Sequence, residues 1–143
     1  MASVERLQGE HIVRWSTLNV LLSSFLFATA GLAHEMTPAY PQARPTSADG
    51  VVKFEMSLFN ARDDVEFYEL AVLNKNWELV RFAAIDRILH VPHDERIFFD
   101  VYIRTTDLDQ AIYICTRSKL SANNSGAALV ASTICSRTDG ERP

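Results

Sequence analysis

Basic residues are scarce and scattered in this sequence. The chain carries 14 Lys and Arg against 18 Asp and Glu, for a formal net charge of -4, and no run of basic residues occurs. Clusters of Lys and Arg supply most of the affinity of proteins for nucleic acid and for anionic lipid. The charge balance therefore argues against both kinds of partner.

Catalytic motifs are also missing. The sequence has no Gly-x-Ser-x-Gly elbow and no phosphate-binding Gly-rich loop. Residues 90–95 include several residue types that can bind metal ions. His90 lies in a predicted strand and His93 follows a proline, so their side chains need not converge on one ion. We therefore expect a protein that is not an enzyme and that has no cofactor.

Charge is absent from residues 15–33, which are rich in Leu, Phe, Val, Ala and Ser. Small residues close this stretch, with Gly31 and Ala33 at the -3 and -1 positions of a cut before His34. A short apolar core followed by a small-x-small site is typical of a secretory signal peptide. Residues 1–33 are therefore predicted to be removed from an exported protein, periplasmic or secreted, that has no membrane contact afterwards.

Three alternatives qualify this boundary. The cut can instead fall before Gly31, and the stretch can be retained as a membrane anchor, although its Ser, Thr and Asn dilute the roughly 20 apolar residues that a spanning helix needs. Initiation at Val13 would give the signal a shorter and more ordinary start.

The chain has only two cysteines, Cys115 and Cys135, and both lie in the exported part. An even number in an oxidising compartment predicts a disulfide, and two free buried thiols are the alternative. Antiparallel pairing of the last two predicted strands sets these residues opposite each other if the turn lies near Ser125.

Residues 34–50 are rich in proline and predict an extended lead-in or an edge strand. Period-two alternation then begins and is clearest where Ile97, Phe99, Val101 and Ile103 alternate with more polar neighbours. The predicted strands cover residues 52–58, 65–73, 77–82, 85–91, 97–104, 111–118 and 129–136.

No convincing amphipathic helix interrupts these segments. About seven short strands at spacings near ten residues predict an all-β, immunoglobulin-like antiparallel sandwich over residues 51–138, followed by a polar tail at 139–143. A small barrel is the alternative arrangement.

The opening of this domain contains Arg44, then the pair Asp49-Gly50, and then a predicted strand that ends at Asn60. This pattern resembles PapD-like periplasmic pilus chaperones. In that family an Arg, here Arg44, precedes an Asp-Gly turn, here Asp49 and Gly50, and then a strand that ends in Asn, here Asn60. Residues 88–96 are similar to the family's strand, proline-containing turn and next strand. The resemblance implies an immunoglobulin-like domain that binds pilin subunits by lending them an edge strand.

The resemblance also implies a basic pair that anchors the subunit's terminal carboxylate. Arg44 matches the first member, and Lys119 and Arg137 are candidates for the second. Such chaperones carry a second sandwich domain, whereas this sequence predicts one. Residues 99–104 also resemble small exported proteins of marine bacteriophages, a likeness that implies no activity.

The last predicted strand has an unprotected sequence. Residues 129–134 contain no charge and no proline, and such strands are templates for a guest strand when they lie at a sheet edge. We expect Val130 and Ile134 to offer side-chain contacts to a protein partner and Ser132 to offer a main-chain donor. An interior position in its sheet is the alternative.

The function expected from these observations is a non-enzymatic binding or assembly module of the cell envelope or of a virion. The alternative is a periplasmic copper-binding protein. A mature chain that starts at His34 would present an α-amine and an imidazole, which together can bind one copper ion, but no further ligands can be named from the sequence.

Overall fold

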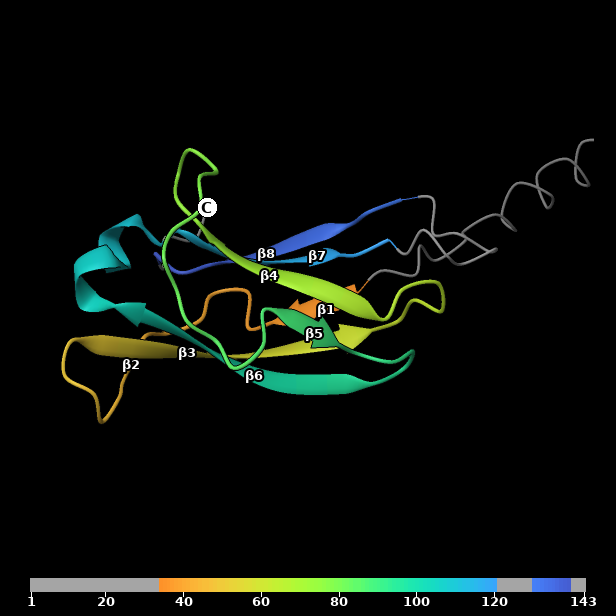
Figure 1. The fold of residues 1–143 in the computed structure, drawn as a ribbon, viewed down its shortest axis with the longest axis horizontal. Helices are drawn as coiled ribbons and strands as arrows, with labels where there is room; N and C mark the ends of the chain where they lie inside the picture. Colours follow the sequence, from red (N-terminus) through yellow and green to blue (C-terminus); the bar gives the residue numbers. More distant parts are fainter. Residues whose placement is uncertain (1–33, 121–129, 140–143) are drawn as a thin grey trace, which may run out of the picture. The chain divides into compact units, whose positions relative to one another are not determined.

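The computed structural model describes residues 34–120 and 130–139, all within the compact unit Leu32–Pro143. These residues form two antiparallel sheets of four strands each, stacked as a β-sandwich (Figure 1). The predicted all-β sandwich is therefore confirmed. The predicted signal peptide, the turn near Ser125 and most of the polar tail lie outside the described residues.

The first sheet is built around its longest strand, β3 (Val51–Asn60). On one side β3 pairs with β1 (His34–Thr37) near its end and with β2 (Arg44–Pro45) near its start. On the other side β3 pairs along most of its length with β6 (Arg96–Arg104). The proline-rich lead-in thus contributes two short strands to this sheet.

The second sheet has the order β5–β4–β7–β8. Its strands are β4 (Phe67–Leu73), β5 (Ile88–His90), β7 (Tyr113–Ser118) and β8 (Thr133–Arg137). A 3-10 turn, η1 (Thr105–Gln110), connects β6 to β7 across the two layers. In immunoglobulin domains the second and fifth strands share one sheet while the third, sixth and seventh share the other. The β3–β6 pair and the β4–β7–β8 group have this arrangement.

The core lies between the sheets, where alternate residues of each strand point inward. The period-two pattern read from the sequence places the buried side chains correctly. The main contributors from the four long strands are Phe54, Met56, Leu58, Tyr68, Leu70, Val72, Val101, Ile103 and Ile114.

The predicted strand at 77–82 is wrong. Leu79 makes only an isolated bridge to Leu73, because the chain turns sharply just before it. The Asn74 side chain accepts the N–H groups of Asn76 and Glu78, and the intervening Trp77 has a positive φ of 65°. A side chain that satisfies main-chain donors holds the segment in a turn. The predicted strand at 85–91 likewise shortens to β5.

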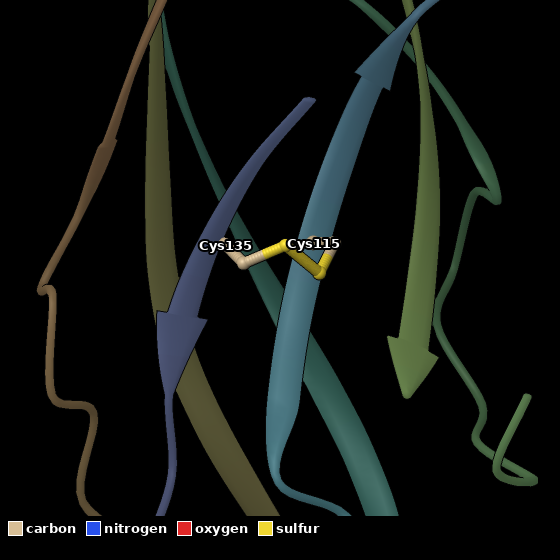
Figure 2. Close-up of a disulfide and its surroundings, with 2 residues drawn as sticks. All are labelled: Cys115 and Cys135. Atoms are coloured by element: carbon tan, nitrogen blue, oxygen red, sulfur yellow. A yellow bond between two sulfur atoms is a disulfide. The ribbon is translucent and has the colours of Figure 1, made fainter. Parts of the chain in front are cut away.

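The disulfide between Cys115 and Cys135 is confirmed. These residues face each other in the β7–β8 register, with a Cα–Cα distance of 4.0 Å and an S–S bond of 2.06 Å. Figure 2 shows that the bond links two neighbouring strands. The bridge therefore fixes β8 to its own sheet and does not tie the two sheets together.

No helix within residues 34–120 and 130–139 has the length and apolar character needed to cross a membrane.

Candidate functional site

A cluster of polar side chains is buried where β3 passes into β4, and its centre is Asn60. The Asn60 amide donates to the carbonyls of Val65 and Val91, at 2.7 and 2.9 Å. Its side-chain oxygen accepts the N–H of Arg62 and the hydroxyl of Tyr68. Because Asn60 is completely buried, these four bonds satisfy groups that water cannot reach.

Arg62 extends this cluster toward β8. Its guanidinium forms a two-pronged ion pair with Asp64, at 2.7 and 2.6 Å, which lowers the pKa of that carboxyl. The remaining nitrogen donates to the Val130 carbonyl and the Ser132 hydroxyl, both at 3.1 Å. The side chain is only 9% exposed, so this cation is held in place by several partners at once.

His34, at the start of β1, completes what we call the His34 cluster (His34, Asn60, Arg62, Tyr68 and Ser132). Its ring is 2% exposed and lies 4.7 Å from the Tyr68 ring, with Nδ1 3.1 Å from the Ser132 hydroxyl. Nε2 has no hydrogen-bond partner among the described residues.

Burial is the main reason that the pKa of His34 lies below its usual 6.5. The nearby carbonyl of Thr116 opposes this shift and the positive charge of Arg62 adds to it. The neutral ring is therefore the form that fits the folded protein.

The contacts of the His34 ring bear on the copper alternative. No group of three or more His, Cys, Asp or Glu that could hold a metal ion occurs in the part of the chain that the structure describes. The Nδ1 atom is engaged with Ser132, and the guanidinium of Arg62 contributes a positive charge that opposes a second cation. His90 and His93 are exposed and face different acids, Glu66 and Asp94.

The three basic residues suggested as a carboxylate anchor each form an ion pair with a nearby acid: Arg44 with Glu55 (3.1 Å), Lys119 with Glu69 (3.1 Å) and Arg137 with Asp139 (2.8 Å). Arg44 pairs in register with Lys53, near the start of β3. The N–H of Lys119 instead donates to the carbonyl of Phe67, the first residue of β4, which follows the end of β3 in the chain. The eight residues from Lys53 to Asn60 span about 23 Å. Arg44 and Lys119 therefore lie near opposite ends of the sandwich.

The last strand lies at the edge of its sheet, but Ser132 faces the interior of that sheet. Its N–H donates to the Ser118 hydroxyl at 2.8 Å, and its carbonyl accepts the Ser118 N–H at 2.9 Å. The predicted outward donor at Ser132 is therefore wrong. Main-chain groups alternate in direction along a strand, so the N–H and C=O groups of Thr133 and Cys135 are the ones that point away from β7.

The other two predicted contact residues of this strand, Val130 and Ile134, differ in exposure. Val130 is 66% exposed, and its carbonyl accepts a bond from Arg62. Ile134 is half-buried and packs against the core. At the far end of β8, Arg137 donates its N–H to the carbonyl of Ala39, so the lead-in covers that part of the edge.

A second strand edge belongs to β6. Tyr102 exchanges two main-chain bonds with Ala83 on the side away from β3, at 2.8 and 2.9 Å. By alternation, Arg96, Phe98 and Asp100 also direct their N–H and C=O groups to that side. We call these groups the β6 edge. Within residues 34–120 and 130–139, none of them forms a main-chain hydrogen bond to another segment.

Among the large hydrophobic residues in the strands that the structure describes, Phe98 is the most exposed, at 81%. It sits on the outer face of the first sheet, opposite Ser57. The sequence contained a signal for this site, because Phe98 is an apolar residue on the polar face of an otherwise regular alternation. The sequence could not show that β6 lies at an edge.

One hollow, of about 500 Å³, lies between the segment after Trp77 and η1. It is lined by Leu79, Val80, Arg81, Phe82, Arg87, Asp107 and Gln110. Arg87 lies 4.6 Å above the Phe82 ring and donates to the carbonyl of the same residue. The guanidinium of Arg87 is thus used for packing, and we assign no site to the hollow.

No protein-family model matches the chain, and no curated protein matches it significantly.

Proposed function

We propose that this protein is an exported, non-enzymatic binding or assembly module of the cell envelope or a virion, and that it acts through the β6 edge. The observation that carries the proposal is the combination of outward main-chain groups at Arg96, Phe98 and Asp100 with the 81% exposure of Phe98. An exposed edge supplies main-chain hydrogen bonds to a guest strand, and neighbouring side chains select it.

The composition of β6 supports this role. Proteins normally protect sheet edges with Pro, Lys, bulges or very short strands. The first sheet uses this protection on its other side, where Pro38, Pro41 and Pro45 flank or form the short strands β1 and β2. In contrast, β6 has nine residues and contains neither Pro nor Lys, and the two charged residues of its edge, Arg96 and Asp100, have opposite signs. The resemblance to PapD-like chaperones agrees with a domain that works through a strand edge.

Export is supported by the disulfide, because such bonds persist in oxidising compartments. The copper alternative has less support, since Arg62 and Ser132 occupy the surroundings of the His34 ring. A copper titration of the mature protein separates the two ideas.

A site-specific photo-crosslinker tests the proposal. We expect a crosslinker that replaces Phe98 to capture a partner in the native compartment, with the attachment on an extended segment of that partner. Leu79 provides the matched control, because its apolar side chain is 76% exposed but does not flank the β6 edge. Equal crosslinking from both positions, or none from position 98, would show that β6 is not the binding edge.

A further inference from the structure

We infer that the β6 edge binds a second copy of this chain, forming a symmetric dimer in which two β6 strands pair antiparallel about Phe98. This inference rests on the proposed function and names its partner. The dimer would join the two first sheets into one continuous sheet across a twofold axis.

The direction of the main-chain groups fixes the register. The Tyr102–Ala83 bonds set which residues of β6 face outward, and Phe98 is one of them. Antiparallel pairing that is centred on an outward residue makes Phe98 and its counterpart a hydrogen-bonded pair. Arg96 of one copy then faces Asp100 of the other, and this pair also exchanges two bonds.

The sequence around Phe98 is self-complementary in this register. On the outer face, each Arg96 meets an Asp100 of opposite charge, on both sides of a central Phe98–Phe98 contact. On the inner face, Ile97 meets Phe99, and both are partly buried against the core. Opposite charges and aromatic residues that face each other across strands stabilise a sheet, whereas like charges destabilise it.

Antiparallel pairing is favoured over parallel pairing for the same reason. An in-register parallel arrangement would set Arg96 beside Arg96 and Asp100 beside Asp100. The five residues from Arg96 to Asp100 form a pairing of ordinary strand length. A second copy therefore supplies a guest strand of suitable length and charge pattern.

The present partners of the two charged residues leave them available. Arg96 contacts Glu35 at 3.3 Å and donates to the Ser57 hydroxyl at 3.1 Å. Asp100 contacts Lys53 at 3.5 Å and accepts a bond from the Tyr102 hydroxyl at 3.1 Å. These ion pairs are partly exposed, and such pairs contribute little to stability.

A symmetric contact between identical surfaces closes on itself, which limits the assembly to two copies.

Charge reversal with rescue tests the register. Sedimentation of the oxidised mature protein at up to about 200 μM should show a monomer–dimer equilibrium. Arg96→Asp or Asp100→Arg alone should weaken the dimer about tenfold or more, since each places like charges together twice. The double variant Arg96→Asp/Asp100→Arg should return to within about threefold of the parent.

Amide exchange provides a measurement that does not depend on variants. The N–H groups of Phe98 and Asp100 should exchange more slowly as concentration rises, whereas that of Phe99, which faces β3, should not respond. A parent that stays monomeric, or a double variant that folds without regaining the dimer, would overturn the inference. If the crosslinker at position 98 captures a different protein, the proposed function stands and the second copy is the wrong partner.

Discussion

Asn60 connects groups that the sequence places far apart. It receives bonds from Arg62 and Tyr68 and gives them to Val65 and Val91, the last of which is 31 residues away. An ionised Asp in this position could not donate to the two carbonyls. Each buried group left without a partner costs about 1–3 kcal/mol, so the identity of this residue matters for folding.

His34 makes stability depend on pH. Its pKa in the folded protein lies below its usual 6.5, so the unfolded chain takes up a proton first as pH falls. The stability is therefore complete above about pH 6.5 and decreases below it, by at most about 1.4 kcal/mol per pH unit, until the folded form also titrates.

The variant His34→Gln should lose this contribution, since glutamine does not titrate. Urea unfolding at about pH 7.5 and pH 5 should show a smaller difference in free energy for the variant than for the parent. His93→Gln alters an exposed histidine outside the His34 cluster and should behave as the parent does. An unchanged difference in His34→Gln would place the pH dependence elsewhere.

Sequence reasoning singled out His34 and Ser132 for separate reasons and did not foresee that they meet. These residues are 98 positions apart, and only the docking of β1 beside the chain that enters β8 brings them together. Local residue types indicate what a side chain can do, but its partners depend on long-range pairing.

At the level of elements, alternation predicted β3, β4, β6 and β7 because side-chain direction along a strand is a local property. The failure at 77–82 has a local cause too, since the side chain of Asn74 competes with strand pairing for main-chain donors. The sequence could not show which main-chain groups lie free at a sheet edge. We expected β8 to offer the N–H of Ser132 to a partner, yet that donor is bound to the Ser118 hydroxyl.

The disulfide should stabilise the second sheet. Its cysteines are separated by 20 residues, and closing a loop of that size contributes about 3 kcal/mol in the chain-entropy model. The double variant Cys115→Ser/Cys135→Ser should unfold at correspondingly lower urea concentration.

Thiol labelling checks the same bond independently. Alkylation of freshly isolated, unreduced protein should modify neither cysteine. Full labelling of both residues would contradict an oxidised bridge in the native protein, whatever the stability of the double variant.

At the scale of the whole molecule, removal of the predicted signal segment would leave a processed N-terminus. We expect mass spectrometry of the exported protein to find a chain that begins at His34 or Gly31, because small residues precede both positions. An intact N-terminus through Trp15 would indicate a retained anchor and would contradict the cleavage prediction.

The position of the bridge also determines how the protein would respond to tension. A pull on the C-terminus would detach β8 from its end, but the detachment would stop at Cys135, which is bonded to Cys115 on the neighbouring strand. The residues between the two cysteines would bear no load while the bond remains. Its reduction would release about 70 Å of additional contour length, so the redox state of one bond sets how far this chain can be extended.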